Sequence, residues 1–164
     1  MKRITIREAQ KLGGPNPFGL VVTRAADGKP NLMALSWWTY ASNNPPLLAV
    51  CLSQRGYSAE LIRESGEFAL CLVDGSLKEA AFACGTRSGR SVDKAEQFGI
   101  ELIDAETIGT KLVQKSRVAF ECRVEQALTA GDHLIFLANV LAVHADETKS
   151  QLFATCGYGA LTTL

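Results

Sequence analysis

The segment Ser53-Gln54-Arg55-Gly56-Tyr57-Ser58 combines hydroxyls, a cation and a glycine between a predicted strand and a predicted helix. A helix N-terminus presents free N–H groups and the positive end of the helix dipole, so it suits a bound anion. In this interpretation Ser58 both caps the helix and donates its hydroxyl to a phosphate, and Arg55 adds a charged contact. The alternative is an ordinary capped helix beside an exposed arginine.

A second segment, Cys84 to Lys94, is dense in hydroxyls, glycines and cations. It could wrap an anionic ligand, and the alternative is a solvated, mobile loop. The chain has neither a GxGxxG nor a GxxxxGK[ST] pattern, so no nucleotide-binding fingerprint supports the first interpretation.

Two further places hold aromatic or titratable side chains. Trp37 and Trp38 are adjacent near the end of a predicted strand and therefore point to opposite faces, so one of them is available to a ligand or partner. His133 follows a turn and could act as an acid near neutral pH, although turn histidines are commonly only solvated. His144 is the second histidine, and neither has cysteines or carboxylates at metal-ligand spacing, so we predict no metal site. No GxSxG pattern supports a hydrolase.

Strands dominate the elements that must position these residues. Apolar runs predict a hairpin from residues 18–23 and 31–36, and strands over residues 47–52 and 67–73. Alternating polarity predicts a strand over residues 118–128, whereas residues 133–143 are apolar on both faces, which indicates burial inside a barrel or under a subunit interface. Short helices are predicted over residues 58–65, ended by Gly66, over residues 76–84, opened by a capping box from Ser76 to Glu79, and over residues 93–98.

The pattern favours a mainly β (α+β) fold, a closed or nearly closed antiparallel barrel with short helical insertions, over a doubly wound nucleotide fold. The length of 164 residues predicts one domain over residues 1–164. With 17 basic and 17 acidic residues, we expect no nucleic-acid partner. No apolar run is long enough for a membrane helix, and five cysteines without a CxxC pair predict a reduced, cytoplasmic protein.

Taken together, the segments resemble the flavin reductase-like FMN-binding proteins with a split β-barrel, of the flavoredoxin type. The resemblance spans roughly residues 15–145 and is carried by spaced motifs that are jointly specific. These motifs are Asn31-Leu32-Met33-Ala34-Leu35-Ser36-Trp37, Asn44-Pro45-Pro46-Leu47-Leu48-Ala49-Val50, Arg55-Gly56-Tyr57-Ser58, Ile62-Arg63-Glu64-Ser65-Gly66-Glu67-Phe68, Cys84-Gly85-Thr86, Ser88-Gly89-Arg90, Val92-Asp93-Lys94, Glu121-Cys122-Arg123 and Gly131-Asp132-His133.

The resemblance implies an FMN held at a homodimer interface. Its phosphate would lie on the segment containing Ser53, Arg55, Tyr57 and Ser58, and His133 would lie near the face where hydride is exchanged. The remaining implied contacts are to the ring, from Ser36, Trp37, Trp38, Thr39 and Ser42, and from the second loop, by Thr86, Ser88, Gly89 and Lys94.

The implied activity is an FMN-dependent oxidoreductase that takes electrons from NAD(P)H or a redox protein and passes them to flavin or another small-molecule acceptor. Two alternatives remain open. One is an electron carrier or flavin-binding protein that does not turn over NAD(P)H, and the other is a non-redox barrel with another ligand or none. A brief stacking of nicotinamide on a bound flavin needs no dinucleotide motif, so the missing motif does not argue against NAD(P)H.

Overall fold

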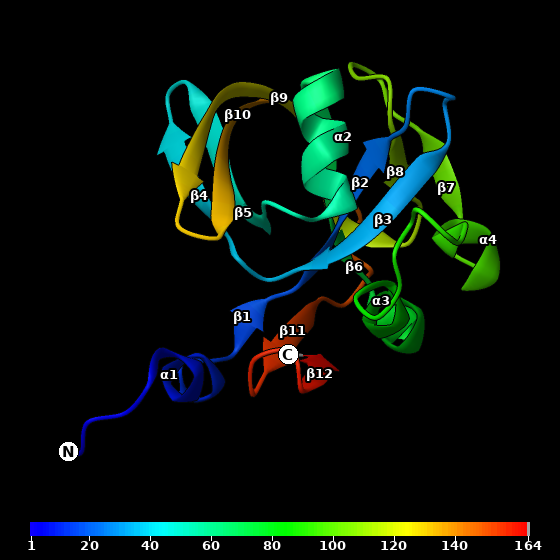
Figure 1. Ribbon diagram of the computed structural model, residues 1–164. Coiled ribbons are helices and arrows are strands. Elements are labelled where there is room, and N and C mark those ends of the chain that lie inside the picture. The colour runs from blue at the N-terminus through cyan, green and yellow to red at the C-terminus, as the bar shows by residue number, and fades with distance from the viewer. Residues whose placement is uncertain (164) are drawn as a thin grey trace.

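A seven-stranded antiparallel sheet forms the body of the computed structural model, which describes residues 1–163 (Figure 1). The strand order β3-β2-β6-β9-β10-β5-β4 places two consecutive strands at opposite edges, so the sheet curls back on itself. This is the split β-barrel that the sequence predicts. The bounds are β2 Gly19–Arg24, β3 Pro30–Leu35, β4 Trp38–Asn43, β5 Pro46–Ser53, β6 Glu67–Val73, β9 Ser116–Ala130 and β10 His133–Ala145.

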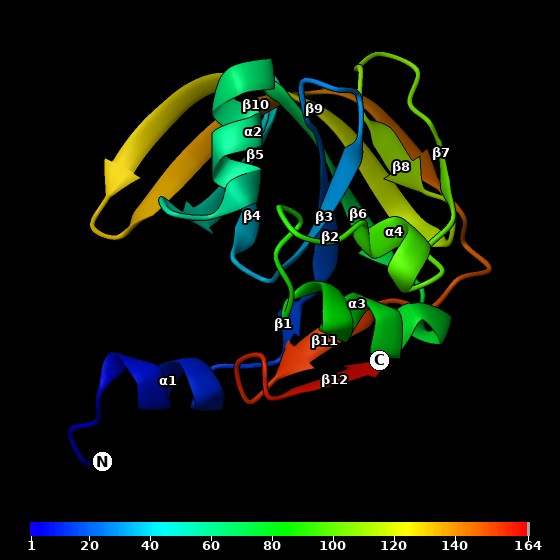
Figure 2. The ribbon, with the colours of Figure 1, turned by 45° about the vertical axis from the view of Figure 1, so that its right-hand side comes forward.

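Within residues 1–163 the helical elements are α1 (Ile6–Leu12), α2 (Tyr57–Ser65), the 3₁₀ turn η1 (Gly75–Leu77), α3 (Lys78–Cys84) and α4 (Lys94–Gln97). Helix α2 stands between the β2–β3 side and the β5–β10 side of the curled sheet (Figures 1 and 2). It buries Ala59, Leu61 and Ile62 there and ends at Gly66, whose φ of 72° is the left-handed conformation expected of a C-terminal glycine.

Two predicted helix caps are wrong. The N-cap of α2 is Gly56, which has no side chain, and the Ser58 hydroxyl instead accepts a hydrogen bond from Asn31 Nδ2 at 2.9 Å. The predicted capping box at Ser76 is also absent from this stretch, because Asp74 caps η1 by accepting the Ser76 N–H at 2.8 Å. In both places the hydrogen-bond partner, Asn31 for the Ser58 hydroxyl and Asp74 for the Ser76 N–H, lies outside the predicted motif.

Short strands that the sequence did not predict complete the fold. The segments β1 (Asn16–Pro17), β11 (Leu152–Thr155) and β12 (Ala160–Thr163) form a three-stranded sheet below the barrel, next to α3 (Figure 2). The segments β7 (Leu102–Asp104) and β8 (Lys111–Val113) form a two-stranded sheet. Strands this short carry too few residues to show an alternating pattern in sequence.

The core has a part on each face of the sheet. Strand β2 is buried on both faces, with Leu20 and Val22 in one cluster and Val21 in the other. Large side chains fill each cluster, among them Phe18 and Leu32 in the first and Phe68, Leu70 and Phe136 in the second. These clusters fix the sheet around which the helices and loops of the functional site are arranged.

Strand β10 differs from its prediction. Leu134, Phe136 and Ala138 are buried, but Leu141 and Val143 on the same strand are 38% and 55% exposed. Within this chain β10 is therefore not covered on both faces, and burial inside the barrel is wrong for its second half. The alternative, a subunit interface, stays a prediction.

Glu121 in β9 is a charged side chain with no exposed surface. Burial raises the pKa of this carboxyl, but hydrogen bonds outweigh that effect and hold the pKa at about 2. The donors are the N–H groups of Glu106 and Thr107, the Thr107 hydroxyl and the His144 ring, at 2.6–2.8 Å. Glu121 thus fastens the loop after β7 to the barrel.

All five cysteines are free, which agrees with the prediction of no disulfide framework. Among residues 1–163, no helix is both long and apolar enough to cross a membrane. The predicted cytoplasmic location stays a prediction.

Candidate flavin site

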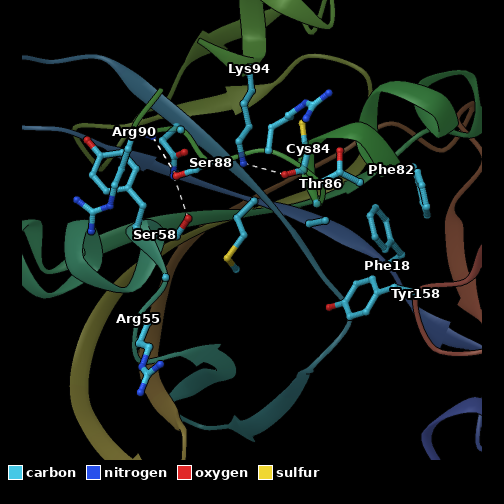
Figure 3. A pocket seen from close by; sticks show the side chains of 18 residues that line it. Phe18, Arg55, Ser58, Phe82, Cys84, Thr86, Ser88, Arg90, Lys94 and Tyr158 are labelled. Atoms are coloured by element: carbon cyan, nitrogen blue, oxygen red, sulfur yellow. Dashed lines mark hydrogen bonds between the residues drawn. The ribbon is translucent and has the colours of Figure 1, made fainter. Parts of the chain in front are cut away.

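A cavity of about 570 Å³ lies between β3, the start of α2, the end of α3 and the loop over residues 85–93 (Figure 3). Its lining combines cationic and hydroxyl side chains with apolar ones. Seven of the predicted cofactor-binding residues line it: Arg55, Tyr57, Ser58, Thr86, Ser88, Gly89 and Lys94. The structure therefore brings together two segments that the sequence treated as separate candidates.

The start of helix α2 forms one end of this cavity. The N–H groups of Ala59 and Glu60 bond to the Gly56 carbonyl, so the N–H groups of Tyr57 and Ser58 precede the first intrahelical bonds. The Ser58 hydroxyl accepts from Asn31, which leaves its own proton to donate. With exposed Arg55 beside it, this end offers several donors and a positive charge to an anion.

Asn31 is a site residue that the sequence analysis did not select. It is 6% exposed, lines the cavity, and its Nδ2 donates to both Thr23 Oγ1 at 3.0 Å and Ser58 Oγ at 2.9 Å. One feature of the sequence could have identified it: Asn31 is the single amide at the start of an otherwise apolar strand. A buried amide needs hydrogen-bond partners, so such a residue is expected to contact other polar groups.

Lys94 is the most unusual side chain in the cavity. It is 5% exposed, and its Nζ donates to the carbonyls of Leu32 and Cys84, both at 2.7 Å (Figure 3). Burial lowers the pKa of this ammonium, and within residues 1–163 no carboxylate pairs with it. An ammonium has three N–H donors, so one remains for a ligand. A buried, uncompensated cation favours an electron-rich or anionic ligand.

The loop over residues 85–93 is fastened across the cavity. Arg90 makes two hydrogen bonds to the Glu60 carboxylate, at 3.1 and 2.5 Å, and its guanidinium lies 4.6 Å from the centre of the Tyr57 ring. Hydrogen bonding to Arg90 lowers the pKa of Glu60. Gly89 packs so closely on Asn31 that a Cβ would come within 1.9 Å of Asn31 Oδ1. Glycine is therefore required for this approach.

A second cavity of about 280 Å³ shares Met33, Ala34 and Tyr158 with the first. Three predicted site residues line it, namely Trp37, Ser53 and His133. The Trp37 and His133 rings lie 5.0 Å apart at 36°, and His133 Nδ1 lies 2.7 Å from Asp132 Oδ1. This hydrogen bond lowers the pKa of Asp132 and fixes the orientation of the imidazole.

Residues 13–162 match the family model described as "Flavin reductase like domain". The chain belongs to the flavin reductase-like family. An uncharacterized protein of Aeropyrum pernix is 33% identical over the whole chain, and the chain spans 63% of that relative's length. A flavoredoxin of Methanosarcina acetivorans is 26% identical with a TM-score of 0.87, covering 100% of this chain and 92% of the other.

A structure of an FMN-binding protein from Thermus thermophilus with bound p-hydroxybenzaldehyde shows the same fold. Its TM-score is 0.83 at 24% identity, and the alignment covers 92% of this chain and 86% of that one. The family match confirms the resemblance predicted from the sequence.

Four predicted ring contacts of this flavin reductase-like chain, Ser36, Trp38, Thr39 and Ser42, are not among the residues that line either cavity. Trp38 donates from Nε1 to the Pro17 carbonyl at 3.1 Å and packs with its ring 6.3 Å from that of Phe120. Thr39 and Ser42 lie on β4 and are not among the residues that line either cavity. The Ser36 N–H donates to the Tyr158 hydroxyl at 2.9 Å, at the junction of the two cavities.

Proposed function

We propose that the chain binds FMN in the first cavity and transfers electrons from NAD(P)H or a protein donor to flavin or another acceptor. The observation that carries this proposal is the pairing of a helix start with the buried Lys94 ammonium in one cavity. The first suits a phosphate, and the second suits a ring that becomes anionic on reduction.

The choice of FMN over FAD has two supports. A monoester phosphate is a terminal dianion, which fits the N–H groups at the start of α2 together with Arg55. The Thermus FMN-binding protein, which is similar to this chain in fold, is the second support.

Each part of the cavity would have its own task. Arg55, Ser58 and the α2 N–H groups would hold the phosphate, and Lys94 would place its remaining N–H and its charge beside the ring. Phe18 and Met33 would exclude water from the apolar part of the cavity. The flavin itself supplies the reversible uptake of electrons.

His133 would serve the second cavity as a proton donor or acceptor. Asp132 engages Nδ1, so Nε2 is the ring nitrogen left to exchange a proton. The Trp37 ring packs on the imidazole and limits its movement.

The alternative function is an electron carrier that holds FMN without NAD(P)H turnover. The similarity to flavoredoxin over the full length of this chain favours it as the second candidate. The two functions differ in whether nicotinamide reduces the bound flavin.

One experiment separates these functions. The protein is loaded with FMN and desalted, its visible spectrum is recorded, and NADH and then NADPH are added without oxygen. Retained flavin that bleaches supports the oxidoreductase and identifies the donor. Retained flavin that stays oxidised supports the carrier, and a protein that neither retains FMN nor turns it over contradicts both.

We also propose that two copies assemble into a homodimer. Leu141 and Val143 on β10 and Leu128 on β9 are 38–55% exposed, and these strands pair with each other. Exposed apolar side chains spread along two adjacent long strands are the kind of side chains that a second copy buries.

A further inference from the structure

Three buried polar side chains, Thr23, Asn31 and Ser58, lie in a row behind the start of α2. They come from β2, β3 and the first turn of α2, and they are 0%, 6% and 3% exposed. A buried polar group needs hydrogen-bond partners, so each of these side chains must direct its donors and acceptors to particular atoms. The row ends at Ser58, which lines the first cavity.

The protons of this row all point in one direction. The Thr23 hydroxyl donates to the backbone carbonyl of Asn31, its neighbour across the two strands, through a long hydrogen bond of 3.5 Å. The Thr23 oxygen therefore faces the Asn31 amide as an acceptor, and Asn31 Nδ2 donates to it at 3.0 Å. The second Nδ2 proton goes to Ser58 Oγ at 2.9 Å (Figure 3). Both amide protons are thus used inside the protein.

Ser58 is left as a donor toward the cavity. Its oxygen accepts from Asn31, and among residues 1–163 no protein acceptor takes its own proton. The side chain lines the cavity next to the N–H groups at the start of α2, with Arg55 beside them. The Ser58 hydroxyl, the N–H groups and the guanidinium therefore all offer protons at the same place.

The opposite orientation of the Asn31 amide would change this site. With Oδ1 next to Ser58, the serine proton would bond to that oxygen, and a ligand would meet only the serine lone pairs. The acceptor on Thr23 favours Nδ2 on this side. Asn31 Oδ1 instead lies toward Gly89, where an added Cβ would come within 1.9 Å of it.

We propose that Thr23 and Asn31 are positioning residues that hold the Ser58 proton toward the cavity, so that the start of α2 selects terminal groups that only accept hydrogen bonds. A phosphate monoester dianion is such a group, whereas the terminal hydroxyl of riboflavin also donates. The inference rests on the proposed function, since it takes the phosphate of FMN to lie at the start of α2. Thr23 and Asn31 then act on the phosphate through Ser58.

Asn31→Asp tests this role, because it keeps the size of the side chain but makes it an acceptor to which Ser58 must donate. The readout is the preference for FMN over riboflavin, measured by fluorescence titration, since a general loss of stability affects the binding of both flavins. In the wild-type background Ser58→Ala should lower this preference about tenfold or more, because a hydrogen bond to a charged group is lost. In the Asn31→Asp background the same change should lower it less than about threefold.

Two comparisons separate proton direction from other effects. The carboxylate of Asn31→Asp also repels a phosphate, but this repulsion is present with and without the Ser58 hydroxyl and cancels in the comparison. Asn43→Asp makes the same exchange at an exposed amide in β4 that lines neither cavity, so Ser58→Ala should keep its full effect there. Should Asn31→Asp fail to fold, Thr23→Val replaces it. This variant removes the acceptor that orients the amide, so it should likewise reduce the effect of Ser58→Ala.

An effect of Ser58→Ala that is equal in the wild-type and Asn31→Asp backgrounds would overturn the inference, as would a Ser58→Ala variant with an unchanged preference for FMN. Wild-type protein is measured first. Equal affinities for riboflavin and FMN there contradict the proposed phosphate site, and the inference fails with it. A wild type that prefers FMN but shows no coupling between Asn31 and Ser58 contradicts the inference alone.

Discussion

At the scale of single residues, the cavity divides its positive charge between an exposed position and a buried one. Arg55 lies beside the start of α2 in contact with solvent, whereas Lys94 is almost completely buried. The two cations therefore act on different parts of a ligand. The exposed one recognises a group that stays partly hydrated, and the buried one acts in a low dielectric, where a charge has a larger effect.

Arg55→Gln is expected to weaken FMN binding about tenfold or more and to leave riboflavin binding almost unchanged, because a hydrogen bond to a charged group contributes about 1.5 to 3 kcal/mol. Fluorescence titration with both flavins measures the difference. The control is Arg63→Gln, which removes an exposed arginine from the last turn of the same helix. A wild-type protein that binds FMN and riboflavin equally well would contradict a phosphate site here.

Lys94→Met is expected to lower the two-electron reduction potential of the bound flavin, because the reduced ring loses a nearby positive charge. A tenfold loss of preference for reduced over oxidised flavin corresponds to about 30 mV. Spectroelectrochemical titration of wild type and variant gives the shift. An unchanged potential in a variant that still binds FMN would show that the Lys94 charge does not act on the ring.

At the scale of elements, the loop over residues 85–93 and helix α2 work as a pair. The Arg90–Glu60 contact and the close packing of Gly89 on Asn31 hold the loop against the helix, so donors from both elements reach one cavity. The contact between charged groups is exposed and is weakened by salt. The fit of Gly89 depends on shape and is independent of salt.

Gly89→Ala should lift the loop, since the added methyl would overlap Asn31 Oδ1. Overpacking of this kind costs about 1 to 3 kcal/mol, so FMN affinity should fall about fivefold to a hundredfold. Equilibrium titration with FMN provides the measurement. Ser91→Ala, an exposed position in the same loop, is the matched control. An affinity equal to that of wild type would mean that the loop does not close on the cofactor.

Glu121 makes the stability of the folded protein depend on pH. Its folded pKa of about 2 lies below the ordinary value, so its contribution to stability is present above about pH 4.5 and is lost as the pH falls toward 2. The difference between the ordinary pKa of 4.5 and the folded pKa of about 2 corresponds to about 3 kcal/mol. Glu121→Gln should therefore destabilise the protein by about 3 kcal/mol at pH 7 and much less at pH 2.

Urea denaturation at both pH values measures this difference. Glu125→Gln is the control, because Glu125 lies on the same strand with its side chain exposed and bonded to Asn139. A loss of stability in Glu121→Gln that is equal at pH 7 and pH 2 would contradict the assignment.

At the scale of the whole molecule, the exposed apolar surface of β9 and β10 leads to a prediction about assembly. Light scattering at micromolar concentration should give a dimer for wild type and a monomer for Val143→Asp, since a buried, unpaired carboxylate disrupts an interface. Leu12→Asp in α1 changes an apolar side chain that is 75% exposed and far from these strands along the chain, and it should remain dimeric. A monomeric wild type would refute the dimer itself.

The sequence predicts the long elements well, because alternation and apolar runs report burial directly. Strand β6 begins and ends where the pattern places it, and Gly66 ends α2 as expected. The predicted roles of Ser58 and Ser76 as helix caps were wrong. Ser58 bonds to Asn31 and Ser76 bonds to Asp74, and local sequence spacing does not identify either of these partners.

In the candidate site, too, local motifs could be predicted from the sequence and long-range contacts could not. Ser58 and Lys94 belong to recognisable motifs and reach one cavity, but Asn31 and Tyr158 were not selected as site residues. Asn31 contacts Ser58 only because β3 packs against α2. Tyr158 lies in a hairpin more than 100 residues along the chain from its partner Ser36. Side chains brought together by long-range contacts leave little local trace in a sequence.

The buried Lys94 has a consequence for how this fold balances stability against activity. Because its pKa is lowered on folding, the charged ammonium opposes folding at neutral pH, and this penalty falls as the pH rises toward the ordinary lysine pKa. An apolar residue at position 94 would make the protein without its cofactor more stable. A flavin that compensates the charge would relieve the same penalty, so the protein should gain more thermal stability from its cofactor than a neutral cavity of this size would.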